Sequence, residues 1–250
     1  FLNATNFNQP LNKWNTSNVN DMGYMFYNST NFNQPLNDWN TLNVTNMSFM
    51  FERAFDFNQP LNDWNTSNVN DMSYMFAGAN YFNQPLNTWD TSNVINMKYM
   101  FFNAEKFNQP LNDWNTFNVN TMRFMFESAE NFNQPLNTWD TSNLDDMDRM
   151  FQNATNFNQP LNNWDTSNIT YMGRMFLGAE KFNGDITSWN TSNVRDMSYM
   201  FYIANDFNQN ITNWPVCDNL VDNDNATDMF CDATTWLANY LSLIHISEPT

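Results

Sequence analysis

The chain has 250 residues and a formal net charge of −17, although only 14% of its residues are charged. With 9 Lys and Arg against 26 Asp and Glu, its surface repels phosphate backbones, which argues against nucleic acid as a partner. No apolar run reaches the roughly 18 residues of a membrane span, and a hydrophobic content of 42% excludes simple disorder.

A tandem repeat of 25 residues organises most of the chain. Methionine and phenylalanine columns begin at Met22, Met25, Phe7 and Phe26 and continue without an insertion. Tryptophan recurs in the same register as Trp14, Trp39, Trp64, Trp89, Trp114, Trp139, Trp164, Trp189 and Trp214. One such unit cannot bury its apolar side alone, whereas stacked units share a continuous core. The repeat therefore predicts a solenoid.

The first half of each unit is short, as the copy at residues 57–81 illustrates. Its apolar anchors are Leu61 and Trp64, which follow Pro60. Proline has no amide hydrogen and suits the start of a strand or a turn. We therefore expect a short strand or extended segment over residues 61–65.

The second half of the unit has the apolar spacing of a helix. Val69, Met72, Met75 and Phe76 stand at i, i+3, i+6 and i+7, which places them on one helical face. The preceding Thr-Ser-Asn of residues 66–68 are residue types that cap helix N-termini. This pattern predicts a helix of about ten residues, so that the fold class would be an α/β repeat solenoid.

Asparagine occupies two columns without variation, one from Asn8 to Asn208 and one from Asn18 to Asn193. Free exposed positions would drift between copies, so we expect these side chains to form a buried hydrogen-bonded ladder, joined by the Thr16 column. Its first members are Asn8, Asn33, Asn58 and Asn83. The alternative, that asparagine simply suits turns, fits the more variable positions.

Other columns change from copy to copy, which indicates exposure to solvent. One includes acidic residues and another includes aromatic and basic residues, and exposed columns of a solenoid form a continuous surface. The candidate ligand face consists of Asp38, Asp63, Asp113, Tyr24, Phe49, Arg149 and Arg174. Neutral drift would produce the same variation, so the face is a hypothesis.

The repeat resembles the unit of BspA-like leucine-rich-repeat surface proteins, W-(D/N)-T-S-(N/K)-V-x-x-M-x-x-M-F. Here the motif stands as residues 64–69, followed by Met72, Met75 and Phe76, and the resemblance covers residues 1 to about 215. It implies a leucine-rich-repeat-like solenoid that is secreted or held at a cell surface, functions in adhesion and recognition, and has no catalytic residues. Gly184-Asp185 departs from the repeat, since the seven preceding units have Gln-Pro.

The C-terminal part divides into an atypical unit and a tail. We expect a solenoid of about nine coils over residues 1–215, a capping repeat over 216–240 and a non-repeat tail over 241–250. Cys217 and Cys231 are the only cysteines, and their place in the cap suggests a disulfide and an oxidising compartment. Two reduced thiols are the alternative. The acidic segment 222–228 lacks the glycine and distal glutamate of an EF-hand, which favours a solvated loop over a calcium site.

These features favour binding over catalysis. The single histidine lies in the tail, so nucleophilic and metal chemistry lack their usual residues, and we expect no cofactor and no metal. The densest carboxylate group, Asp145, Asp146 and Asp148, is placed by the helix pattern at a helix start, where acidic residues are expected. Four sequons in variable or loop columns are candidates for glycosylation: Asn3, Asn28, Asn153 and Asn225.

The predicted function is non-enzymatic adhesion, or recognition of a protein or glycan on another cell or matrix, by an extracellular or cell-surface protein. The alternative is a structural subunit of an extracellular filament or coat, because regular solenoid ends can self-associate.

Overall fold

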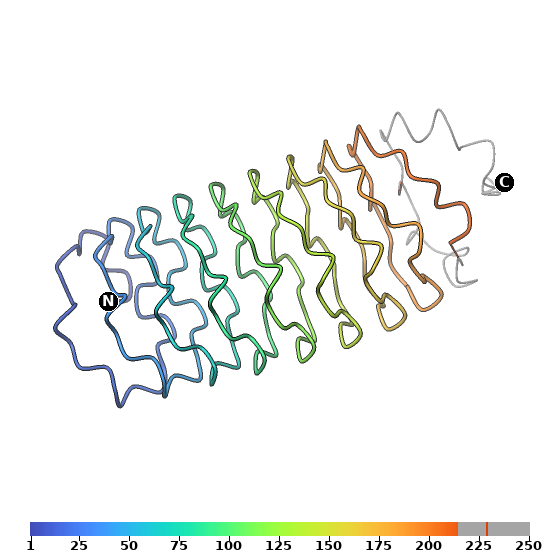
Figure 1. Cartoon of the computed structure of the whole chain (residues 1–250). Helices are drawn as coiled ribbons and strands as arrows, with labels where there is room; N and C mark the ends of the chain where they lie inside the picture. The colour runs from blue at the N-terminus through green and yellow to red at the C-terminus, as the bar shows by residue number, and fades with distance from the viewer. Residues whose placement is uncertain (215–228, 230–250) are drawn as a thin grey trace.

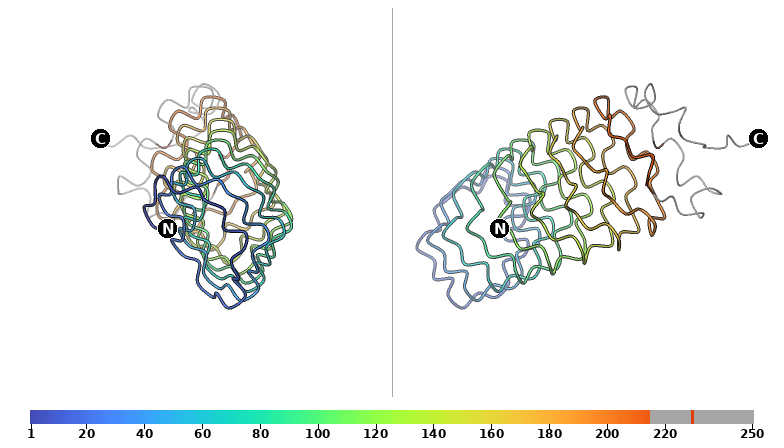
Figure 2. Two further views of the ribbon diagram at one scale, coloured as in Figure 1. Left: turned by 90° about the vertical axis from the view of Figure 1, so that its left-hand side faces the viewer. Right: turned by 45° about the vertical axis from the view of Figure 1, so that its right-hand side comes forward.

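In the computed structural model, which describes residues 1–214 and Met229, the repeats stack into one rod. Successive coils follow one another from the N-terminal end toward the C-terminal end (Figure 1). A view from the N-terminal end of the rod shows the coils superposed around a shared interior (Figure 2). The predicted solenoid is confirmed. The predicted cap and tail lie outside the described residues.

The predicted strand and helix are both wrong. Within residues 1–214, the backbone forms turns and extended links, with no helix or strand assigned. The only sheet-like pairing in this part consists of single-residue parallel bridges between successive coils, for example Asp71 with Asn96. Residues 61–64 form a turn closed by a hydrogen bond from Trp64 N to Leu61 O. With no helix in the described residues, none is long and apolar enough to cross a membrane.

Alternating hydrogen bonds explain why residues 69–81 do not form a helix. The amides of Met72, Tyr74 and Phe76 donate to carbonyls 24 residues later, in the next coil, at 2.9–3.1 Å. Of the amides between them, Met75 N donates three residues back to Met72 O at 3.2 Å, and Ser73 N donates to the Asp71 side chain at 2.8 Å. An α-helix would instead direct every amide to the residue four positions earlier. About half of the amide donors in this segment therefore bond to the next coil.

Left-handed residues make this path possible. Tyr74 has φ 58° and Gly78 has φ 67°, and the equivalent residues of other coils share these angles. Each Tyr74-type residue is third in a four-residue turn, a position where type II turns require positive φ. Glycine or asparagine at the Gly78 position in several coils is the sequence signal of this geometry, since these residues tolerate positive φ.

The core consists of the repeated apolar columns. Phe51 stacks on Phe57, six residues later, at 4.0 Å between ring centroids, and on its equivalent Phe76, 25 residues later, at 5.6 Å. Tryptophan rings also stack between coils, and each is tied to the backbone; Trp64 Nε1 donates to Leu36 O at 2.9 Å. The Trp, Met and Phe faces are thus buried against neighbouring coils, as the repeat predicts.

The asparagine ladder is confirmed, with a different degree of burial. Asn58 Oδ1 accepts hydrogen bonds from the Asn83 amide and from Gln84 Nε2, both at 3.0 Å. Its column is mostly half-buried rather than buried. The Asn18 column is exposed, yet Asn68 Nδ2 donates to Leu42 O at 2.7 Å and most other members bond likewise. Hydrogen bonding between coils, and not burial, accounts for the invariance.

The Thr16 column completes these side-chain links between coils. Thr66 Oγ1 donates to Asp90 O of the next coil at 2.9 Å, and the threonine is buried. The column therefore joins the ladder as predicted, at a turn rather than at a helix cap.

The repeat departure at Gly184 changes the local path of the backbone. A Cβ placed on Gly184 would collide with the backbone oxygen of Gln159, although other coils have glutamine at this position. Leu161 N donates to Asp185 O at 2.9 Å, a bond that the other described coils do not make. The sequence change thus coincides with a shift of one coil toward its predecessor.

The coils are packed more closely on one side of the rod than on the other. Equivalent ring centroids are 4.3 Å apart for Tyr74 and Tyr99, but 6.4 Å apart for Trp64 and Trp89. When coils are related by a rotation, equivalent points are closest near the rotation axis. The side of the rod that carries Tyr74 is therefore the inner, more closely spaced side, and that of the tryptophans is the outer one.

Candidate functional site

A continuous row of aromatic and basic side chains follows the inner side of the rod. We call it the aromatic strip; it consists of Tyr24, Phe49, Tyr74, Tyr99, Phe124, Arg149, Arg174 and Tyr199. The first five rings stack in sequence at 4.2–4.4 Å between centroids, with interplanar angles of 7–11°. Most of these side chains are half-buried, so the strip presents ring edges and charged groups to solvent.

Every residue of the strip lies in the left-handed region of backbone conformation, with φ of 56–61°. For a bulky residue this conformation costs about 1–2 kcal/mol. The surrounding bonds hold it in place: Tyr74 N donates to Lys98 O at 3.0 Å, and Ala77 N donates to Tyr74 O at 3.1 Å. Strained residues of this kind persist where the structure over-determines them, and they cluster at functional sites.

The hydroxyl groups at the middle of the strip remain protonated at neutral pH. Burial raises the pKa of Tyr74 to about 12, helped by the neighbouring Tyr99, to which Tyr74 is hydrogen-bonded. Burial also raises the pKa of Tyr99. The centre of the strip is therefore a row of neutral rings with hydroxyl groups at its edge.

Guanidinium groups continue the strip where the stacked rings end. Arg123 and Arg149 lie over the Phe124 ring at 4.8 and 5.0 Å from its centroid, and Arg174 lies over Tyr199 at 5.2 Å. This cover leaves Phe124 only 6% exposed, whereas Tyr24 at the other end is 46% exposed. Cation–π attraction thus orders the basic half of the strip.

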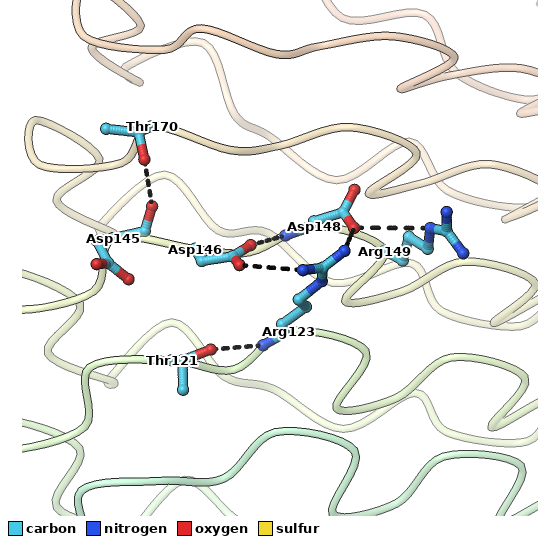
Figure 3. Close-up of polar contacts among 7 residues, drawn as sticks. All are labelled: Thr121, Arg123, Asp145, Asp146, Asp148, Arg149 and Thr170. Carbon is cyan, nitrogen blue, oxygen red and sulfur yellow. Dashed lines mark hydrogen bonds and ion pairs between the residues drawn. The ribbon is translucent and has the colours of Figure 1, made fainter.

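A cluster of charges lies beside the strip at Arg123 (Figure 3). Its guanidinium contacts Asp148 at 2.9 Å and Asp146 at 3.9 Å, and Arg149 Nε lies 3.6 Å from Asp148. Burial raises the pKa of both carboxyls, and the Arg123 charge opposes this shift. Asp146 Oδ1 also accepts the Asp148 amide at 2.9 Å, so these carboxylates belong to a turn and not to the predicted helix start.

The sequence profile of the family described as Mycoplasma protein of unknown function, DUF285, matches residues 1–80, 59–154 and 135–242. The chain belongs to this family. No curated protein and no solved structure gives a significant match. The match is to DUF285 and not to a BspA-like or leucine-rich-repeat family, so that resemblance stays a prediction.

The DUF285 chain separates the predicted ligand-face residues into two sets. Tyr24, Phe49, Arg149 and Arg174 belong to the aromatic strip. Asp38, Asp63 and Asp113 are exposed in another column, eleven positions away in a 25-residue coil. Within residues 1–214, no hydrogen bond, ion pair or ring contact joins the two sets. The structure therefore provides two separate candidate surfaces.

The acidic column is hydrogen-bonded to the adjacent asparagine column and to the preceding coil. Asp63 N donates to Asn37 Oδ1 at 3.0 Å, and Asp63 Oδ1 accepts from Asn62 Nδ2 at 3.0 Å. Thr88 and Thr138 stand in the same column and donate to carbonyls of the preceding coil at 2.7 Å. The residues of this column thus help to hold coils together.

Sequence reasoning missed Tyr74, Tyr99, Phe124 and Arg123 as members of the site. The signal was present, because aromatic residues recur in this column every 25 positions from residue 24 to residue 124. The orientation of these side chains could not be predicted, because the expected helix placed the column on a helix surface.

The remaining predicted sites of the DUF285 chain stay predictions. Asn3 and Asn153 are exposed, and Asn28 Nδ2 donates to Asn3 Oδ1 at 2.9 Å. Asn225, the disulfide Cys217–Cys231 and the acidic segment lie outside the described residues. Within the part of the chain that is described, no three His, Cys, Asp or Glu side chains are grouped as metal ligands would be.

A buried carboxyl beside the charged cluster predicts a pH dependence of stability. Burial raises the pKa of Glu127 to about 7, with Arg149 opposing and Asp148 reinforcing the shift. The unfolded chain releases this proton near pH 4.5 and the folded chain near pH 7, so stability falls between these values and then levels. We expect Glu127→Gln to remove this pH-dependent loss of about 1–2 kcal/mol in the free energy of unfolding. The value is smaller than the full pKa shift would give, because the carboxyl retains some access to solvent.

Urea unfolding from pH 4 to pH 8 measures this effect. Glu130→Gln, which changes an exposed carboxylate three residues away, is the matched control and should leave the profile as in the wild type. Identical profiles for Glu127→Gln and the wild type would refute the assignment.

Proposed function

We propose that the chain is a non-enzymatic binding protein that recognises a protein or glycan on another cell or matrix through the aromatic strip. The observation that carries the proposal is the strip itself: eight successive coils present aromatic or arginine side chains from one strained backbone position. The scaffold does not need these side chains for its own core, which is formed by other columns.

The chemistry of the strip suits recognition. Tyrosine and arginine are enriched at the centres of protein interfaces, where they supply contact area and hydrogen bonds at low entropic cost. Because stacking and cation–π contacts already order the strip, binding would immobilise few side chains. Its place on the inner side of the rod agrees with the use of concave surfaces by other solenoids.

The proposed location is the cell surface or the extracellular space. It rests on the resemblance of the W-N-T-S-N-V-x-x-M-x-x-M-F unit to BspA-like surface repeats and on the pair of cysteines in the predicted cap. A net charge of −17 keeps an aromatic-rich rod soluble by self-repulsion.

Substitutions in the two columns test the strip against the acidic column. The strip variant combines Tyr24→Asn, Phe49→Asn and Arg174→Asn, because asparagine tolerates the left-handed backbone. The control variant replaces Asp38, Asp63 and Asp113 by the threonine that other coils have in the same column. Adhesion of cells and of extracellular matrix to the immobilised proteins is measured, and urea midpoints confirm that both variants are folded.

We expect the strip variant to lose at least tenfold in binding and the control variant to bind as the wild type does. The reverse result would assign recognition to the acidic column. Absence of any cell or matrix binding by the wild type would refute the proposed function.

The filament alternative has one supporting observation. Most of the backbone bonds between described coils recur from one pair to the next, so an uncovered coil presents the same donors and acceptors to another rod. Electron microscopy of the purified full chain tests it: fibres that grow with concentration would favour the structural role.

A further inference from the structure

A shallow hollow of about 500 Å³ is lined by residues that do not belong to the aromatic strip. Three successive coils form it, each with two adjacent residues: Phe55 and Asp56, Asn80 and Tyr81, Glu105 and Lys106. These positions recur every 25 residues from Thr5 and Asn6, at a turn between coils. The volume is within the range of sites for small ligands, about 300–1,000 Å³.

Two aromatic side chains of the hollow leave ring surface open to solvent. Tyr81 is 57% exposed and Phe55 is 37% exposed. Neither makes a ring–ring contact within the described part of the chain, whereas the rings of the core and most of the strip are stacked. At these two repeat positions the other coils have only Thr, Asn, Glu, Lys or Asp. The aromatic pair is therefore a local feature that the scaffold does not require.

Polar groups of both kinds surround the rings. Glu105 Oε1 accepts a hydrogen bond from Asn80 Nδ2 at 2.8 Å, which fixes both side chains. Backbone bonds from Tyr81 N to Phe55 O and from Lys106 N to Asn80 O hold the three coils in register at 3.2 and 3.1 Å. The carboxylate of Asp56 and the ammonium of Lys106 make no hydrogen bond or ion pair with another residue in the described part of the chain, 1–214.

We propose that this hollow binds a neutral saccharide as a second recognition site, separate from the aromatic strip; the inference rests on the proposed recognition function and adds a ligand class to it. A pyranose ring has apolar C–H faces, which pack on aromatic surfaces, and hydroxyl groups, which both donate and accept hydrogen bonds. The hollow offers Phe55 and Tyr81 for the faces, Asp56 and Glu105 as acceptors, and Lys106 as a donor. The strong negative charge of the chain disfavours sialylated or sulfated glycans.

The repeat supplies a variant that removes the hollow's rings with little risk to the fold. Phe55→Thr and Tyr81→Asn each introduce a residue that other coils have at the same position. The matched control is Phe117→Ser, which removes an aromatic side chain that is 50% exposed in a column where most coils have serine. Calorimetry and a glycan array measure binding of neutral glucose, galactose, mannose and N-acetylglucosamine oligosaccharides, with sialylated and sulfated glycans alongside.

We expect the full chain to bind at least one neutral oligosaccharide at millimolar concentration or below. The double variant should bind it at least tenfold more weakly, and Phe117→Ser should bind as the wild type does. The proposal is overturned if no neutral saccharide binds, if anionic glycans bind equally well, or if the double variant binds undiminished. Adhesion that persists in the double variant and is lost in the strip variant would leave the proposed function standing without the saccharide site.

Discussion

Replacement of Trp114 by alanine is expected to lower the free energy of unfolding by about 3–5 kcal/mol. The Trp114 side chain is 3% exposed and stacks between Trp89 and Trp139, each at 6.5 Å between ring centroids. Its Nε1 donates to Leu86 O at 3.0 Å. The substitution would open a cavity across three coils and leave that carbonyl without its partner.

Trp14→Ala is the matched control for this prediction. Trp14 occupies the same repeat position but is 52% exposed, and its one ring contact within the described residues is with Phe1 at 5.6 Å. Urea unfolding followed by circular dichroism should show a loss of at most about 1 kcal/mol for this variant. Equal losses for the two variants would mean that stacking between coils does not stabilise the rod.

The second large effect is expected from Asn83→Ala in the asparagine ladder, a loss of about 2 kcal/mol. Asn83 Oδ1 accepts hydrogen bonds from the Asn108 amide at 3.0 Å and from Gln109 Nε2 at 2.9 Å. Alanine would leave both donors of the next coil without this acceptor in a half-buried position, where water replaces it incompletely.

Asn83→Asp tests whether the acceptor oxygen alone is needed, because it keeps an acceptor oxygen and removes the amide NH2 group. The carboxylate has two acceptor oxygens where the amide has one, and hydrogen bonds to a charged acceptor are stronger. Stability near that of the wild type is therefore expected at pH 7. Differential scanning calorimetry on the wild type and the two variants measures this. If aspartate costs as much as alanine, the ladder depends on the shape of the side chain or on its amide group rather than on its oxygen.

The apolar columns show how the same pattern can serve two backbones. Val69, Met72, Met75 and Phe76 are buried, as the helix prediction requires. Yet turns of alternating bond direction place the same side chains inward without any helix. The wrong prediction arose because side-chain burial was correct and the hydrogen-bond partners were not visible, since they lie 24 residues away.

The candidate site was predictable to a similar extent. Tyr24 and Arg174 were recognised as members of a variable column, but the column was interpreted as freely exposed, whereas stacking half-buries most of it. Asp63 was grouped with these residues, although no hydrogen bond, ion pair or ring contact within residues 1–214 joins its column to the strip. Both differences come from the missing backbone path, which sets where each column points.

By itself, the sequence determined the 25-residue period, the stacking of the coils and the identity of the core columns. Large apolar residues at identical positions in every unit can all be buried only against their equivalents in neighbouring units. The tertiary structure alone decided the path within each coil, the left-handed residues and the closer spacing along the aromatic strip. These features depend on hydrogen bonds and ring contacts between coils, and a local sequence pattern contains no information about which distant carbonyl an amide will meet.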